Sequence, residues 1–264
     1  PSIIGPGCVV NPGKFYAELD YLEANGFDST LVKVSPRAHI IRANHIRDDK
    51  EKLASALGTT SNGIAPCYAE KAARTGVRAK DVLPDNYIWD EQLWGNVLCE
   101  GAQGMWLDMD WGDYPWVTSS NTLPYAACSL GFPTSKIRQT VGVVKAYDTR
   151  SGNDPLFPKS LLKDPELSKI GDIGKEYGVT TGRRRKVNWL NFDLLRKAVD
   201  ITGPTQIIVN KVDVLEEIGI YKIILDGEIK QFQNWDDMAD FISKDLVRRD
   251  VDTIWFSRDP EEII

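Results

Sequence analysis

The sequence predicts an α/β protein with a central, mostly parallel sheet flanked by helices. Two observations indicate this class: segments of helical and strand character alternate along the 264 residues, and the apolar segment 206–209 is typical of a buried strand. A hairpin predicted at 221–232 is expected as a small insertion in this fold. A chain of this length can form one large domain, so we expect a single α/β domain over residues 1–264.

Composition excludes several classes of protein. The formal net charge of −6 and the pI near 5.1 argue against non-specific nucleic-acid binding. No apolar run approaches the ~20 residues of a membrane span, and no signal peptide is recognised. The four cysteines lack zinc-site spacing, so we expect reduced thiols in a cytoplasmic protein. His39 and His45, six residues apart, are interpreted as structural, and no metal ligand is expected in this chain.

The first half of the chain contains clear helix boundaries. Asn11 and Pro12 are typical of a helix start, and Gly26 of a stop. Ile3-Ile4-Gly5-Pro6-Gly7 is typical of a strand end entering a turn, which indicates that the sequence begins inside a fold. We expect a helix at 12–25, a strand at 31–34, a charged helix at 42–57, a short basic helix at 68–74, a turn at 84–86 and a buried strand at 97–99.

In the second half, Asp226-Gly227 lies between alternating apolar residues and predicts a hairpin over 221–232. We expect a loop at 148–175, helices at 125–130, 192–199 and 236–247, and strands at 141–147, 206–209 and 253–256.

Residues 98–122 form the most distinctive stretch. The short apolar run 97–99 stops at Glu100-Gly101-Ala102-Gln103-Gly104, and glycines there would let a ligand approach the backbone closely. The stretch ends in the hydroxyl and amide residues 118–122, which are poor in a helix interior and suit a phosphate- or sugar-binding loop. An ordinary surface loop with a polar tip is the alternative. Four carboxylates are interleaved with aromatic residues here: Glu100, Asp108, Asp110 and Asp113.

Asn210-Lys211-Val212-Asp213 follows the predicted strand 206–209. In GTP-binding folds this N-K-x-D spacing reads guanine, because the aspartate accepts hydrogen bonds from N1–H and the 2-amino group while the lysine stem packs along the ring. Adenine lacks this donor pair and would leave the carboxylate unpaired. A charged loop after a strand is the alternative.

Two further stretches are candidate anion sites. Residues 180–186, Thr-Thr-Gly-Arg-Arg-Arg-Lys, combine hydroxyls with cations whose guanidinium forks suit carboxylates and phosphates. The loop 58–63 precedes Lys71, Arg74 and Arg78, which we expect on one helix face. A solvated basic turn or face would explain either pattern.

Together these motifs resemble the adenylosuccinate synthetase family. Five stretches match in the family's order and cover most of the chain: 58–78, 100–122, 141–150, 176–190 and 210–215. The resemblance implies a P-loop-NTPase-like ligase fold and a purine-biosynthesis enzyme that condenses IMP with L-aspartate. It also implies that GTP first phosphorylates the purine 6-oxygen, with Mg²⁺ and positioned cations spreading the phosphoryl charge.

The resemblance also assigns residues. The purine monophosphate would be bound by Thr60, Arg74, Gln103, Thr118 and Arg183, with Arg74 acting across the interface of a homodimer. The aspartate would be bound by Thr180, Thr181, Arg183 and Arg185, and the nucleoside triphosphate by Arg185, Lys211, Asp213 and Ser257.

Several features depart from the family pattern. Its front segment, a glycine-rich phosphate loop with the catalytic Asp, the Mg²⁺ contacts and the His that follows, has no counterpart here. We expect the catalytic residues in that segment, outside the sequence given. Ser257-Arg258-Asp259-Pro260 replaces Ser-Thr-Gly-Pro, and residues 149–155 differ from Thr-Arg-Val-Gly. Two alternatives therefore stay open: the family's phage branch, which makes 2-aminoadenylosuccinate from dGMP with ATP or dATP, and a catalytically dead, nucleotide-binding paralogue.

Overall fold

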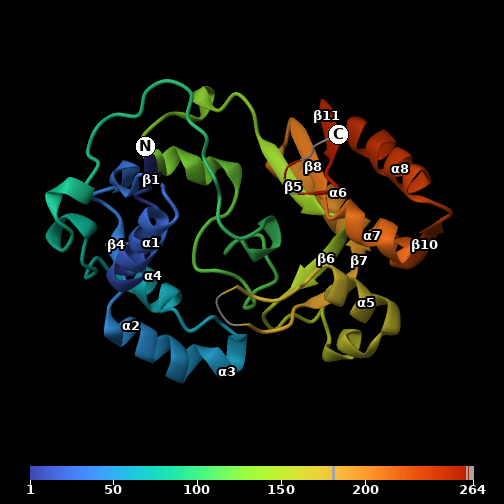
Figure 1. Ribbon diagram of the computed structural model, residues 1–264, viewed down its shortest axis with the longest axis horizontal. Helices are drawn as coiled ribbons and strands as arrows, with labels where there is room; N and C mark the ends of the chain where they lie inside the picture. Colours follow the sequence, from blue (N-terminus) through green and yellow to red (C-terminus); the bar gives the residue numbers. More distant parts are fainter. Residues whose placement is uncertain (180–181, 260, 262–264) are drawn as a thin grey trace. The chain divides into compact units, whose positions relative to one another are not determined.

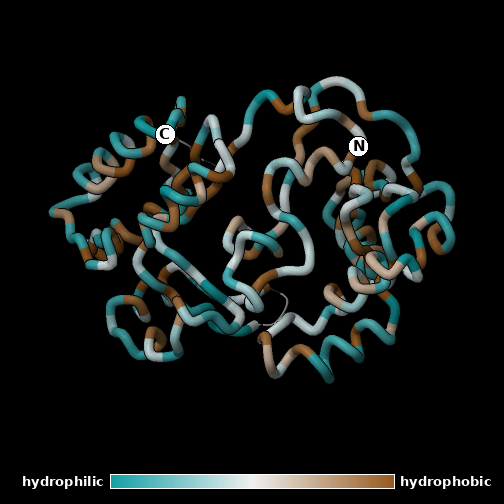
Figure 2. The backbone as a smooth tube through the Cα atoms, turned by 180° about the vertical axis from the view of Figure 1, so that it is seen from behind, coloured by the Kyte–Doolittle hydropathy of each residue, from teal (hydrophilic) through white to brown (hydrophobic). Residues whose placement is uncertain are grey.

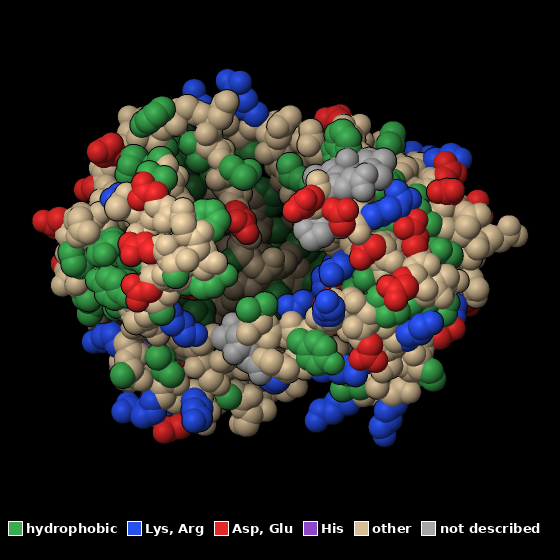
Figure 3. All heavy atoms as spheres, in the orientation of Figure 1, with side chains coloured by type: hydrophobic (Ala, Val, Ile, Leu, Met, Phe, Trp, Pro, Cys, Tyr) green, Lys and Arg blue, Asp and Glu red, His purple; other side chains and the backbone are tan. Residues whose placement is uncertain are grey.

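The computed structural model describes residues 1–179, 182–259 and 261, and it divides into two compact units, residues 1–136 and 137–264 (Figure 1). Each unit contains parallel strand pairs accompanied by helices, which confirms the predicted α/β class. Within the described ranges, no helix is both long and apolar enough to cross a membrane. Acidic and basic side chains are interspersed on the face drawn in Figure 3.

The N-terminal unit is built from short elements. Its parallel pairs are β1 with β3 and β2 with β4. The strands are β1 (Ser2–Ile4), β2 (Val9–Val10), β3 (Val32–Val34) and β4 (His39–Ile40), and the α-helices are α1 (Pro12–Ala24), α2 (Ala43–Asp48), α3 (Ala54–Leu57) and α4 (Ile64–Ala73). A π-helix, Asp49–Leu53, joins α2 to α3, and short 3-10 helices occur at Ser29–Leu31, Ala79–Asp81, Asp85–Tyr87, Met105–Leu107, Pro124–Leu130 and Thr134–Lys136.

Helix α1 begins as the sequence predicts. The side chain of Asn11 accepts a hydrogen bond from the backbone N–H of Lys14 at 3.2 Å, and Pro12 occupies the first turn. Both histidines of this unit are buried, and Nδ1 of His45 accepts a hydrogen bond from the backbone N–H of Arg42 at 3.1 Å. The small core lies around α1 and these strands and comprises Val10, Phe15, Leu19, Val34, Ala38, Ile40, Ala79 and Leu83.

Three expectations for this unit need correction. The predicted strand at 97–99 is absent, and Leu98 is 93% exposed; an apolar run forms a strand only where a neighbour completes its ladder, and none of the described residues does so here. The predicted shared helix face is wrong, because α4 ends at Ala73, Arg74 takes φ 64° and Arg78 is extended. The helix expected at 125–130 is a 3-10 helix.

The C-terminal unit contains the larger sheets. In the order β11-β8-β5 every pair is parallel, and in the order β10-β9-β7-β6 only the β9–β7 pair is parallel. The strands are β5 (Val141–Lys145), β6 (Tyr147–Arg150), β7 (Lys186–Asn191), β8 (Gln206–Asn210), β9 (Tyr221–Leu225), β10 (Glu228–Phe232) and β11 (Thr253–Phe256). The helices are α5 (Pro165–Ile173), α6 (Phe192–Thr202), α7 (Val212–Ile218), α8 (Trp235–Val247) and a 3-10 helix, Lys159–Lys163.

Helix α8 illustrates how this unit is packed. Figure 2 shows hydrophobic and hydrophilic residues alternating along its turns, and the residues it buries recur at helical spacing. The buried positions are Trp235, Met238, Ile242 and Leu246, which belong to one core with the central strands.

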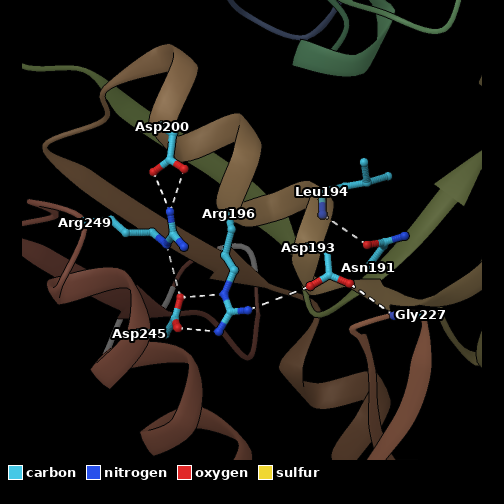
Figure 4. Close-up of polar contacts among 8 residues, drawn as sticks. All are labelled: Asn191, Asp193, Leu194, Arg196, Asp200, Gly227, Asp245 and Arg249. Atoms are coloured by element: carbon cyan, nitrogen blue, oxygen red, sulfur yellow. Dashed lines mark hydrogen bonds and ion pairs between the residues drawn. The ribbon is translucent and has the colours of Figure 1, made fainter.

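Ion pairs tie α6 to α8 and to the segment that follows it (Figure 4). Asp245 of α8 accepts two hydrogen bonds from Arg196 of α6, at 3.0 and 2.5 Å. Arg249 donates to Asp245 and, from the other side, to both oxygens of Asp200 on α6 at 2.6 Å. Bidentate contacts of this kind hold two helices in one register.

The hairpin is confirmed: β9 pairs with β10, and Asp226 and Gly227 both have positive φ angles, 53° and 77°. The loop expected over 148–175 is wrong, because β6 and α5 lie within it. Asp164 caps α5 by accepting a hydrogen bond from the backbone N–H of Leu167 at 3.0 Å, and Pro165 starts the helix. Strand β7 and helix α7 were not foreseen.

Candidate functional site

In the N-terminal unit, Asp108 organises the stretch singled out in the sequence. Its side chain is fully buried and accepts hydrogen bonds from the backbone N–H groups of Thr122 at 2.6 Å, Asp110 at 3.0 Å and Trp111 at 3.2 Å. Burial opposes ionisation, but these donors outweigh it and hold the pKa of Asp108 below its usual value. The Asp108 carboxylate therefore holds both ends of the segment 110–122.

Close backbone packing completes this loop. A Cβ on Gly112 would lie 2.6 Å from the carbonyl oxygen of Asp108, so the position needs glycine. The N–H of Thr118 donates to the carbonyl of Leu107 at 2.8 Å, and the hydroxyl of Thr122 donates to the carbonyl of Gly104 at 3.1 Å. The loop surface is thus set by polar contacts rather than by a large apolar core.

A second buried carboxylate holds the loop 58–63. Asp49 accepts hydrogen bonds from the Thr59 hydroxyl at 2.7 Å and from the Gly63 N–H at 2.8 Å. Gly63 has φ 77°, and a Cβ there would meet the backbone of His45 at 2.9 Å. Both candidate phosphate loops of this unit therefore turn around an interior carboxylate.

The predicted monophosphate residues of this unit lie on the two loops and at the end of α4. Thr60 is exposed, and its hydroxyl accepts a hydrogen bond from Asn62 at 2.9 Å. Gln103 is exposed with φ 63°, and Thr118 is partly buried. Arg74 is exposed at the C-cap of α4. No hydrogen bond or ion pair joins these four described residues to one another.

In the C-terminal unit, the candidate residues Lys211, Asp213 and Ser257 follow the carboxyl ends of strands in the parallel sheet β11-β8-β5. The register pairs Lys145, the last residue of β5, with Asn210, the last of β8, and Phe256 with Val209. Lys211 and Ser257 directly follow β8 and β11. In open α/β sheets, ligands bind beyond the carboxyl ends of the strands.

Backbone contacts join the Asn210–Asp213 motif to the residues after β11. The N–H of Val212 donates to the carbonyl of Ser257 at 3.3 Å, and the Ser257 N–H donates to Val209 at 2.9 Å. Lys211 has φ 63°, which turns the chain into α7, whose first turn carries the exposed side chain of Asp213. These backbone contacts bring Lys211 and Asp213, on either side of Val212, near Ser257.

Glu176, which sequence reasoning did not single out, connects several of these cations. It is 1% exposed, and its side chain accepts hydrogen bonds from Lys145 at 2.6 Å, Tyr147 at 2.9 Å and Arg185 at 2.9 Å. The ammonium of Lys211 lies 3.4 Å from the carbonyl oxygen of Gly174. The only sequence signal was its place, nine residues before Arg185 within the matching stretch 176–190.

The other predicted residues belong to the segment 180–186. Arg183 is exposed in the C-terminal unit, and its carbonyl accepts a hydrogen bond from Gly178 at 2.9 Å. Thr180 and Thr181 lie outside the described residues. No group of three or more His, Cys, Asp and Glu that could hold a metal ion occurs within 1–179, 182–259 and 261.

Comparison with known proteins agrees with the order of these motifs. The sequence profile of the adenylosuccinate synthetase family matches residues 1–94 and 87–240. The chain is 35% identical to an adenylosuccinate synthetase of Fusobacterium nucleatum, over 87% of this chain and 68% of the relative, and 36% identical to one of Phocaeicola vulgatus, over 84% and 65%. It spans about two thirds of the length of the curated relatives it matches.

Two solved structures have the same fold. A fully ligated adenylosuccinate synthetase from Plasmodium falciparum aligns with a TM-score of 0.79 at 22% identity, covering 98% of this chain and 82% of the other. The succinoaminodeoxyadenylate synthetase of cyanophage S-2L, bound to dGMP and dATP as an energy donor, aligns with a TM-score of 0.68 at 16% identity, covering 99% and 75%. At these identities the likeness concerns the fold alone.

Proposed function

The chain belongs to the adenylosuccinate synthetase family, and from this premise we propose that the intact protein condenses IMP with L-aspartate at the expense of GTP. The observation that carries the proposal is the carboxyl edge of β5 and β8, where Lys145 and Arg185 bind Glu176 and Lys211 of the Asn210–Asp213 motif donates to the carbonyl of Gly174. Such an edge can hold a nucleotide base and its anionic groups together.

The proposed reaction has two steps. The γ-phosphoryl group of GTP is transferred to the 6-oxygen of IMP, which makes that oxygen a leaving group. The aspartate amine then attacks C6 and displaces phosphate, so that GDP, inorganic phosphate and adenylosuccinate are the products. Fixed cations favour the first step, because charge spreads over the phosphoryl oxygens in its transition state.

We assign the binding residues by unit. In the N-terminal unit, Thr60, Gln103 and Thr118 contact the purine monophosphate, and Arg74 reaches the monophosphate bound to the other subunit of a homodimer. In the C-terminal unit, we assign Arg183 to the purine monophosphate, Thr180, Thr181, Arg183 and Arg185 to aspartate, and Arg185, Lys211, Asp213 and Ser257 to the triphosphate. The exposed Asp213 suits the N1–H and 2-amino donors of guanine.

Mg²⁺ is part of the proposal as the ion that neutralises the triphosphate. It usually retains several waters and binds one or two carboxylates plus substrate phosphates. The described residues offer no set of three clustered ligands, so we derive no step through the ion from this chain. We place the protein in the cytoplasm, where reduced cysteines and these substrates are expected.

The experiment that tests the function measures inorganic phosphate released from GTP by the intact protein. Release is expected only when IMP and L-aspartate are both present. Phosphate release that does not require aspartate would contradict a ligase of this type. A protein that binds GTP yet releases no phosphate with both substrates would support the catalytically dead paralogue.

One observation favours the phage-type alternative, which uses dGMP with ATP or dATP. Arg258 forms a bidentate ion pair with Glu216, at 3.0 to 3.1 Å, and Glu216 lies one turn after Asp213 on α7. Arg258 and Asp259 stand where the family has Thr-Gly, so a base next to Asp213 would have different neighbours from those in the family. Measuring kcat/KM side by side for GTP, ATP and dATP, with IMP and with dGMP, decides between the two.

A further inference from the structure

Glu176 is the most deeply buried charged residue among the described residues of the C-terminal unit. Its donors come from separate places in the sequence: Lys145 at the end of β5, Tyr147 at the start of β6 and Arg185 just before β7. One oxygen binds Lys145 and Tyr147, and the other binds Arg185. A single carboxylate therefore sets the distance between two cations.

The backbone holds Glu176 itself in place. Its N–H donates to the carbonyl of Gly171 at 2.9 Å, and its carbonyl accepts from the N–H of Arg185 at 2.9 Å. The chain reaches it through Gly174, where a Cβ would clash with the Tyr147 hydroxyl, and through Lys175, whose φ is 51°. Arg185 is thus attached to Glu176 through both its backbone and its guanidinium.

Glu176 binds more positive charge than it carries negative charge. Lys145 and Arg185 carry two positive charges against the one negative charge of Glu176, and Lys211 adds a third cation nearby. Burial lowers the pKa of Lys145, and the ion pair with Glu176 counteracts that effect. Hydrophobic residues in place of these ions would stabilise the fold at least as well. The cluster is therefore better explained as a means of orienting its cations.

Arg185 keeps capacity to bind a ligand. Its side chain is 30% exposed, and its contact with Glu176 uses one of the five guanidinium N–H donors. The side chain of the neighbouring Lys145 is 25% exposed. A carboxylate or phosphate oxygen approaching the carboxyl edge of β5 would meet two cations already held in position.

We propose that Glu176 is a positioning residue that orients Arg185 toward an anionic group of the substrates. The proposal rests on the proposed function, because the ligand of Arg185 is taken to be aspartate or the triphosphate. Glu176 touches no substrate and acts through Arg185. Substituting Glu176 should therefore affect binding of the same substrate as substituting Arg185.

The test compares E176Q, R185M and the double variant E176Q/R185M in the intact protein. We expect E176Q to lower kcat/KM at least tenfold, mainly by raising the KM of the same substrate whose KM R185M raises. The double variant should equal R185M within about twofold, since a residue that acts only through Arg185 adds nothing once Arg185 is gone. Effects that multiply in the double variant would overturn the proposal.

Two further variants separate positioning from support of the fold. D172N is the control: Asp172 lies on α5 and pairs with Arg184 at 2.8 Å, at the surface, and activity should stay within twofold of wild type. E176D keeps the negative charge, but its shorter side chain moves the carboxylate away from its hydrogen-bond donors. We therefore expect the KM of the substrate affected by R185M to rise at least threefold, with little change in Tm. A lowered Tm with wild-type KM values in both Glu176 variants would show a merely structural role.

Turnover by the wild-type protein is measured first and tests the proposed function separately. If wild type does not turn over, the affinities for GTP and for L-aspartate, measured by titration calorimetry, replace kcat/KM in the comparison. E176Q weakening the same ligand as R185M by the same factor then supports the positioning role, and an unchanged affinity of E176Q for both ligands contradicts it.

Discussion

The two units use buried carboxylates in opposite ways. In the N-terminal unit, Asp49 and Asp108 accept backbone N–H groups and shape loops. In the C-terminal unit, the buried Glu176 and the partly buried Asp245 bind side-chain cations of helices and strands or of the residues next to them. The main buried core of the first unit has eight described residues and that of the second has twenty, so only the second can position its site largely through apolar packing. Changes at an interior carboxylate should therefore deform loops in one unit and misplace cations in the other.

The largest effect is expected at Asp108. Asp108→Asn removes the charge and turns an NH₂ group toward backbone donors, which leaves buried groups unpaired at a cost of about 2–4 kcal/mol. We expect kcat/KM for IMP to fall about 30-fold or more, with faster hydrogen exchange over residues 104–122. Asp110→Asn is the matched control, because Asp110 is exposed in the same loop. Equal losses in both variants would contradict the role given to the interior carboxylate.

The next effect concerns the base-reading side chain of the C-terminal unit. Asp213→Asn replaces an acceptor by a donor that opposes N1–H or the 2-amino group, so GTP should bind ~2–4 kcal/mol more weakly. Xanthosine triphosphate should be tolerated better, since its 2-oxo group accepts from the amide. The measurement is kcat/KM for the triphosphates. Little change in Asp213→Asn, together with ATP or dATP exceeding GTP tenfold in wild type, would indicate an adenine pocket beside Arg258.

A smaller effect is expected at Arg74, which is anchored by the C-cap of α4 rather than by a carboxylate. Arg74→Leu should raise the KM of the purine monophosphate by the loss of one charge-assisted contact, about 1.5–3 kcal/mol, with Tm unchanged. Mixing this variant with one disabled at Arg183 should restore some activity if Arg74 acts across a dimer interface. No recovery in any mixture would argue against a shared site.

The sequence predicted what is local. Asn11 and Pro12 starting α1, Asp226-Gly227 turning the hairpin, and Lys211 with Asp213 following β8 are all encoded within a few neighbouring residues. The cap of α5 at Asp164 was equally local, but the surrounding glycines and prolines suggested a loop.

What could not be predicted depends on contacts distant in sequence. Glu176 meets Lys145 and Tyr147 across 31 and 29 residues, and only the folded sheet brings them together. The run 97–99 shows the converse: apolar character predicted a strand, yet a strand requires a partner that no sequence window contains.

The smallest effect is expected from pH at Asp148, the partly buried first neighbour of Tyr147 in β6. Burial raises the pKa of Asp148 to about 7, against the opposing effects of the Asn191 N–H, 2.8 Å away, and of Lys145. Because the folded-state pKa exceeds the unfolded value of about 3.9, the carboxyl stabilises the fold fully at low pH, and this contribution is lost between about pH 4 and 7.

The variant Asp148→Asn keeps an acceptor for the Asn191 N–H and removes the titrating group. The variant should match wild type near pH 4 and exceed it by about 1 kcal/mol at pH 8, because partial exposure weakens the penalty on the charge. Urea unfolding at both pH values measures this, with Asp240→Asn on the surface of α8 as the control. A stability difference between Asp148→Asn and wild type that does not change with pH would contradict the shifted pKa.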